Sequence, residues 1–140
     1  MPDRGFSHVA LPVSDLDASV AFYERYGGLH VVHRRAQTTD EHKEVAWLSD
    51  GTREFALVLA EFDSVGTPLG PFAHLGVACS TRSELDELCR LAQAEGVLRE
   101  APWDTGGPAG ILAILDDPDG HSLELSFGQE VAWAVHQALT

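Results

Sequence analysis

Two histidines occupy the same position in two similar segments of the chain. FSHVAL begins at Phe6 and FAHLGV begins at Phe72, so His8 and His74 each follow an aromatic and a small residue, 66 residues apart. Glu124 lies between two leucines in SLELSF near the end of the chain, where a carboxylate needs a partner because its removal from water is costly. Two imidazoles and one carboxylate form the donor set of non-haem iron and similar divalent-metal sites.

The alternation of side chains along a β-strand decides whether these groups can meet. His8 shares a strand face with Phe6, and His74 shares one with Phe72. If a pseudo-twofold axis relates the two segments, equivalent faces point into a common cavity, where His8, His74 and Glu124 converge and leave other metal positions open. In the alternative interpretation both histidines are packing residues, the chain is a subunit of a larger complex, and no metal binds.

The histidine segments open two copies of a longer pattern, because each is followed by a helix with apolar residues at helical spacing. Each helix is expected to begin at a capping box and to end at glycine. The residues concerned are Ser14, Asp17, Gly27 and Gly28 in the first copy and Thr81, Glu84 and Gly96 in the second. Each copy therefore opens as a strand followed by a helix.

Three short strand-like runs follow each helix, separated by turn signals such as Asp50-Gly51 and Asp117-Pro118-Asp119-Gly120. The runs are LHVVHRR, HKEVAWLSD and EFALVLAEF in the first copy and VLREAPWD, GILAILDD and HSLELSF in the second. Both copies read βαβββ, which predicts an α+β fold in one domain spanning 1–140. Repeat one is expected at about 5–65, repeat two at about 71–127, and a C-terminal helix at about 128–138.

Composition excludes several classes of partner. Nine Lys and Arg against 22 Asp and Glu give a formal charge of −13, which repels phosphate backbones and anionic lipid, so neither nucleic acid nor membrane is an expected partner. No apolar run is long enough to span a bilayer. The two cysteines, Cys79 and Cys89, have no CxxC spacing and are expected to be reduced thiols in a cytoplasmic protein.

Three stretches of the sequence resemble one known superfamily over nearly the whole chain. HVALPVSDLDASVAFYERYGG, AHLGVAC and DDPDGHSLELS are similar to segments of the vicinal oxygen chelate proteins. This superfamily includes glyoxalase I, methylmalonyl-CoA epimerase, extradiol dioxygenases, fosfomycin-modifying transferases and bleomycin-binding resistance proteins. The resemblance implies an open, cup-shaped mixed sheet built from two βαβββ repeats around a divalent metal.

The resemblance also implies which residues bind the metal. His8, His74 and Glu124 match three ligand positions of the superfamily, and the fourth position falls on Val58, which cannot bind a metal. Members similar to glyoxalase I or the epimerase use four protein ligands, whereas extradiol dioxygenases and fosfomycin transferases use a His, His, Glu set. The leading expectation is a metal-dependent enzyme of extradiol dioxygenase type, or a related lyase or isomerase, acting on a small substrate that chelates the ion through adjacent oxygens. Iron(II) is favoured, and manganese, nickel, cobalt or zinc suit the same donors.

Neither three-ligand subfamily matches completely. The familiar extradiol enzymes also use a second His and a Tyr near the metal, yet both tyrosines, Tyr23 and Tyr26, fall on the first helix. The transferases need a cluster of cationic groups for a phosphonate, which the sequence does not offer. Strand position leaves His33, Glu44 and His121 as candidates for acid–base catalysis, each also interpretable as an ordinary surface residue.

A binding protein is the alternative to an enzyme. In that interpretation the cup sequesters an antibiotic or other natural product, as bleomycin-resistance proteins do, and Phe6, Trp47, Phe72 and Trp103 supply stacking surface. The relatives of this kind lack the metal ligands, which argues against the alternative. In either case the resemblance implies a homodimer, whose site is formed within one chain or shared between two.

Overall fold

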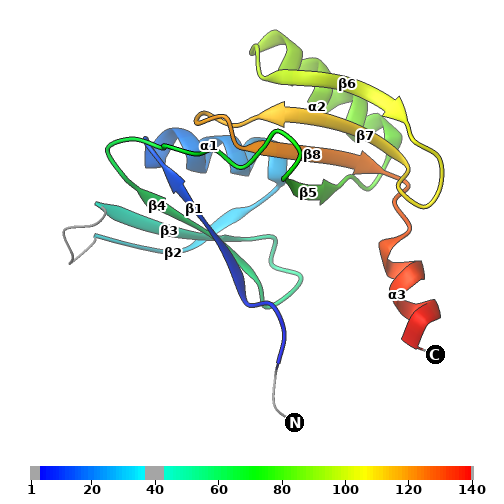
Figure 1. Cartoon of the computed structure of the whole chain (residues 1–140), viewed down its shortest axis with the longest axis horizontal. Coiled ribbons are helices and arrows are strands. Elements are labelled where there is room, and N and C mark those ends of the chain that lie inside the picture. The colour runs from blue at the N-terminus through cyan, green and yellow to red at the C-terminus, as the bar shows by residue number, and fades with distance from the viewer. Residues whose placement is uncertain (1–3, 37–42, 140) are drawn as a thin grey trace. The chain divides into compact units, whose positions relative to one another are not determined.

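The computed structural model describes residues 4–36 and 43–139, and the chain divides between Pro68 and Leu69 into two compact units (Figure 1). Each unit is described by itself. Both contain a four-stranded mixed sheet with a helix packed on one face, so the expected α+β class is confirmed. The prediction of a single domain over 1–140 remains a prediction.

The first unit has the element order βαβββ expected of repeat one. Its sheet has the strand order β1-β4-β3-β2, in which β1 and β4 are parallel and the other pairs are antiparallel. The elements are β1 (His8–Val13), α1 (Leu16–Gly27), β2 (His30–Ala36), β3 (Glu44–Ser49) and β4 (Ala56–Glu61).

The second unit repeats this topology with the strand order β5-β8-β7-β6, and again the first and last strands are parallel neighbours. The elements are β5 (Leu75–Ala78), α2 (Arg82–Ala94), β6 (Leu98–Asp104), β7 (Ile111–Asp116), β8 (Ser122–Phe127) and α3 (Val131–Leu139). The last strand therefore lies inside the sheet, between β5 and β7.

The two helices that follow the histidine segments each bury an apolar stripe on their own sheet. Leu16, Val20 and Tyr23 of α1 are buried, and α1 packs on β3 and β4. Leu85 and Cys89 of α2 are buried in the same way, and α2 packs on β6 and β8. The opposite face of each sheet is left for other contacts.

Helix ends follow the predicted signals with one correction. Gly28 caps the end of α1 with a positive φ of 64°, and Thr81 caps the start of α2 by accepting a hydrogen bond from the Glu84 amide at 3.0 Å. The prediction that Ser14 caps the start of α1 is wrong. The cap is Asp15, whose carboxylate accepts from the amide of Ala18 at 3.1 Å, because the helix starts one residue later than a Ser14 cap requires.

Helix α3 carries apolar side chains that are exposed among the described residues. It contains no Asp, Glu, Lys or Arg, and none of its residues is buried in the structure. Val131, Trp133 and Leu139 are among its exposed side chains. Among the helices of the described residues, none is long and apolar enough to cross a membrane.

Candidate metal centre

The second unit brings two of the three predicted ligands together. Gly76 of β5 pairs in register with Glu124 of β8, and His74 lies two residues before Gly76, directly ahead of β5. Because residues two apart on a strand share a face, His74 and Glu124 project from neighbouring strands to the same side of the sheet. His74 Nε2 is 3.4 Å from Glu124 Oε1.

The hydrogen bond at Nδ1 of His74 determines the tautomer of the neutral ring. His74 Nδ1 lies 2.6 Å from the carbonyl oxygen of Phe72. A carbonyl oxygen only accepts, so Nδ1 must carry the proton, and in a neutral ring Nε2 then presents a lone pair. That lone pair faces a carboxylate oxygen, so two acceptors confront each other. A cation at this position, either a proton or a metal ion, removes the conflict.

Glu124 is held in place from its other side. Gln129 Nε2 donates to Glu124 Oε2 at 3.1 Å, which leaves Oε1 directed at His74. The carboxylate is buried, with 6% of the residue exposed, because β8 is an inner strand of the sheet. A buried carboxylate with a single amide donor is poorly compensated, and a cation bound at Oε1 would supply the missing partner.

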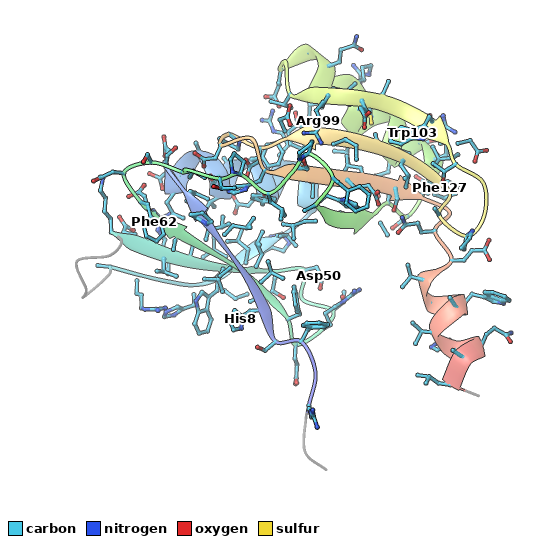
Figure 2. All side chains as sticks on the ribbon, in the orientation of Figure 1. His8, Asp50, Phe62, Arg99, Trp103 and Phe127 are labelled. Atoms are coloured by element: carbon cyan, nitrogen blue, oxygen red, sulfur yellow. The ribbon has the colours of Figure 1, made fainter. Side chains whose placement is uncertain are left out.

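His8 occupies the equivalent place in the first unit, at the start of β1 (Figure 2). It is exposed, and its Nδ1 lies 2.8 Å from Ser7 Oγ. Ala10 pairs in register with Val58, as Gly76 pairs with Glu124 in the second unit. The structure therefore supports the alignment in which Val58 is the repeat equivalent of Glu124. At this pair of positions the first unit has an imidazole and a valine, whereas the second has an imidazole and a carboxylate.

The structure joins His74 to Glu124 but places His8 in the other unit. The described residues contain no group of three or more His, Cys, Asp or Glu side chains arranged to hold a metal. The chemistry of the His74 and Glu124 pair nonetheless fits a divalent ion, since both donors are fixed by further hydrogen bonds and both have a lone pair available. Gln129 was not found from the sequence, because it follows β8 in a segment without periodicity.

The candidates for acid–base catalysis have other contacts. His121 is 1% exposed, and its Nδ1 accepts a hydrogen bond from the Leu69 amide at 2.8 Å. Glu44 accepts from Arg34 Nε at 3.1 Å. His33 lies against Trp47, with ring centroids 4.7 Å apart. His121 therefore anchors the start of the second unit, and Glu44 is engaged in an ion pair.

The thiols are unsuited to nucleophilic chemistry. Cys79 and Cys89 are both free and buried. Desolvation raises the pKa of Cys79 to about 11, and it also raises the pKa of Cys89. Because the thiolate is the reactive form, both side chains are packing residues of the second unit.

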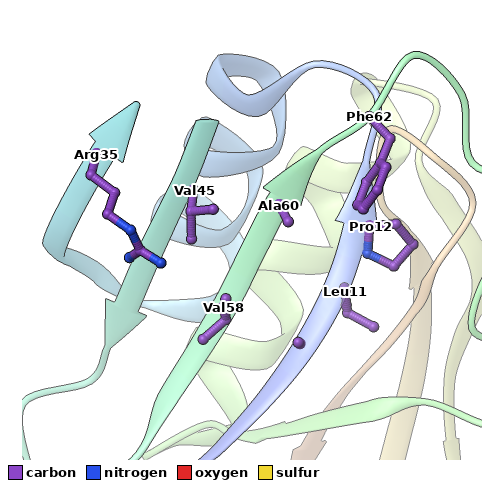
Figure 3. Close-up of a pocket in the computed structure, with 8 residues that line it drawn as sticks. Leu11, Pro12, Arg35, Val45, Val58, Ala60 and Phe62 are labelled. Atoms are coloured by element: carbon purple, nitrogen blue, oxygen red, sulfur yellow. The ribbon is translucent and has the colours of Figure 1, made fainter. Parts of the chain in front are cut away.

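The first unit contains an apolar groove on the sheet face opposite α1. It has a volume of about 470 Å³ and lies along β1, β4 and β3, with Val58 among its lining residues (Figure 3). The lining residues are Ala10, Leu11, Pro12, Arg35, Val45, Val58, Ala60 and Phe62. The groove thus occupies the part of the first unit that corresponds by the repeat to the Glu124 region of the second.

Residues 5–125 match the Glyoxalase/Bleomycin resistance protein/Dioxygenase superfamily. The chain belongs to this superfamily. The expectation from the sequence resemblance is thereby confirmed, and the two βαβββ units with their mixed sheets match the fold.

Relatives and solved structures support the assignment. An uncharacterized protein of Pseudomonas aeruginosa, PA2024, is 36% identical over 127 residues, which cover 88% of each chain. A putative lactoylglutathione lyase of Brassica oleracea is 32% identical over 130 residues, but the match spans 44% of its length and 87% of this chain. The fosfomycin resistance protein FosX of Listeria monocytogenes, solved with Mn(II) and a dihydroxypropylphosphonic acid, superposes with a TM-score of 0.73 at 19% identity, covering 96% of this chain and 99% of FosX.

Proposed function

We propose that this protein is a divalent-metal-dependent enzyme in which His8, His74 and Glu124 hold the ion. The observation that carries the proposal is the approach of His74 Nε2 to Glu124 Oε1 at 3.4 Å, with the imidazole proton held on the other nitrogen by Phe72. His8 is assigned as the third ligand from its repeat-equivalent position. Three protein ligands leave positions for a small organic substrate that binds through two adjacent oxygens.

The chain's own residues prepare the ligands. The Phe72 carbonyl holds the His74 ring in one tautomer, and Gln129 orients the Glu124 carboxylate. Burial of Glu124 excludes water from that carboxylate and strengthens its attraction for a cation. When bound, a divalent ion supplies stabilisation of negative charge that develops on a substrate oxygen.

Among reaction classes, we put dioxygen-dependent ring cleavage of a catechol first, with iron(II) as the metal. Val58 in place of a fourth ligand supports a three-ligand enzyme over one of glyoxalase I type. A lyase or isomerase is the second candidate, because a relative carries the name lactoylglutathione lyase. Oxygen consumption with catechols separates the two, since a lyase or isomerase consumes no oxygen. Sequestration of a natural product predicts ligand binding that needs no metal.

Metal content tests the site directly. The wild-type chain, purified without added ions, is expected to contain one transition metal ion per site by elemental analysis. Glu124→Ala and His74→Ala are expected to lose it, whereas Glu87→Ala, which removes an exposed carboxylate from α2 of the same unit, is expected to retain it. Retention of stoichiometric metal by the Glu124→Ala variant would refute the assignment.

A homodimer completes the proposal, and a cytoplasmic location accords with two free cysteines. Support for the dimer comes from α3, whose uncharged surface is exposed in the single chain. Sedimentation velocity is expected to show a dimer. Mixing His8→Ala with Glu124→Ala chains then distinguishes the two arrangements: a site shared between chains regains metal in the mixed dimer, and a site within one chain does not.

A further inference from the structure

We infer that the groove of the first unit binds the carboxylate group of a small apolar or aromatic molecule, with Arg35 as its anchor. The inference that such a molecule is the substrate rests on the proposed function. The inference that the groove binds such a molecule does not. The groove is formed by residues of the first unit alone and shares no residue with the His74 and Glu124 pair.

Arg35 is the single charged residue among the eight that line the groove. The other seven are apolar, so a guanidinium lies at an otherwise apolar surface. Figure 3 shows the Arg35 side chain extending from β2 toward β3, and Val45 of β3 and Val58 of β4 also line the groove. A ligand in this groove meets one positive charge and hydrophobic walls.

Arg35 is unusual for an arginine of this chain. With 22 acidic and nine basic residues, carboxylates are abundant, and at least six of the basic side chains have one within ion-pair distance. Within the described residues, Arg35 forms neither an ion pair nor a hydrogen bond, and its contact is with the ring of Trp47, 5.6 Å from the guanidinium carbon.

The neighbouring arginine shows the contrast. Arg34 projects to the opposite face of β2, where it contacts Asp17 at 2.8 Å and Glu44 at 3.1 Å. The two side chains differ because Arg34 pairs in register with Ala46 of the core, whereas Arg35 pairs with Val45 of the groove. The Arg34 guanidinium is neutralised by two carboxylates, whereas the Arg35 guanidinium has no carboxylate partner in the part of the chain that the structure describes.

The contact with Trp47 positions the guanidinium without consuming its donors. A guanidinium held over an aromatic ring can still donate two parallel hydrogen bonds along its edge, the geometry that suits a carboxylate. A single positive charge balances one negative charge, so a phosphate dianion would place an uncompensated charge beside apolar walls. The net charge of −13 does not oppose binding at contact distance, because charges further away than about 8–10 Å are screened by salt.

Calorimetric titration of the full-length protein with 2-naphthoate tests the inference, and 2-naphthamide is the neutral ligand of the same shape. Wild type is expected to bind the carboxylate at least about tenfold more tightly than the amide. Arg35→Gln is expected to lose about tenfold or more in affinity for 2-naphthoate. Arg34→Gln, the matched control on the other face of the strand, is expected to stay within about twofold of wild type.

Three results would overturn the inference: equal affinities for acid and amide, unchanged affinity in Arg35→Gln, or equal losses in the two arginine variants. Far-UV circular dichroism confirms that each variant is folded. The titration is repeated with Glu124→Ala protein, where Arg35-dependent binding of 2-naphthoate is expected to persist. If the wild-type protein proves to bind no metal but still binds 2-naphthoate through Arg35, the groove is supported and the proposed function fails. Loss of Arg35 dependence in protein that retains its metal refutes the groove alone.

Discussion

The two sheets have the same topology but carry different chemistry. In the first, Ala10 and Val58 are register partners beside an apolar groove; in the second, Gly76 and Glu124 are partners beside His74. The backbone supplies the same pair of parallel strands in both units. The residue at this one position, valine or glutamate, therefore decides whether the inner strand presents a hydrocarbon surface or a carboxylate.

The two units are alike on the sheet face that packs against the helix and differ on the opposite face. The face packed on the helix is similar in the two units, with Leu59 and Leu125 both completely buried at equivalent positions. The opposite face is free to diverge, because its side chains do not form the core shared by helix and sheet. The contrast between Val58 and Glu124 lies on that face.

The largest expected effect tests the similarity of the two cores. Leu59→Ala and Leu125→Ala each remove a fully buried side chain, and each is expected to lower the free energy of unfolding by about 2–5 kcal/mol. Urea denaturation followed by circular dichroism measures both. A loss below about 1 kcal/mol in one variant would show that the equivalent positions are not packed alike.

Val58→Glu makes the first unit chemically similar to the second. A carboxylate in the groove competes for Arg35 and repels an anionic ligand, so the affinity for 2-naphthoate is expected to fall about tenfold or more. Val58→Gln, which has the same size without the charge, is the control in calorimetry and is expected to bind more tightly than Val58→Glu. Equal affinities in these two variants would contradict an electrostatic role for the groove.

Gln129→Leu sharpens the comparison in the second unit. Glu124 loses the amide that orients Oε2, and the affinity for the metal is expected to fall about tenfold, as for other partners of metal ligands. Competition with a chromogenic chelator measures the change. Glu130→Gln, at the next position, is the control and should leave the metal affinity unaltered.

The smallest expected effect compares the helix caps. Asp15→Ala and Thr81→Ala each remove the side-chain acceptor at a helix start, with an expected cost of about 1 kcal/mol in stability. Thermal unfolding measures both variants against wild type. If Asp15→Ala costs nothing while Ser14→Ala is destabilising, the corrected cap position is wrong.

Much of the fold could be predicted because the βαβββ pattern occurs twice in the sequence, so each copy supports the interpretation of the other. The strands, the helix that follows each histidine segment, and the equivalence of Val58 and Glu124 all followed from the offset between the copies. Within the candidate site, His74 and Glu124, which were expected to converge, lie on paired strands with His74 Nε2 3.4 Å from Glu124 Oε1. The roles of His8, His74 and Glu124 as metal ligands stay predictions.

Other features depend on register and packing that the sequence does not encode locally. Arg34 and Arg35 are adjacent and chemically identical, and the bulge within β2 leaves the alternation of that strand hard to extrapolate. Their opposite faces become clear only from the pairing with β3. Gln129 lies beyond the last strand, where no periodicity indicates that its amide returns to Glu124.

The insertion of β8 between β5 and β7 has a consequence for biosynthesis. Glu124 is contributed by the last strand of this sheet to leave the ribosome, and it must pair with β5, which is made much earlier in the same unit. A nascent chain that ends before Ser122 lacks both the inner strand of this sheet and the carboxylate. The pairing of Glu124 with β5 therefore comes only after the whole of the second sheet has been synthesised.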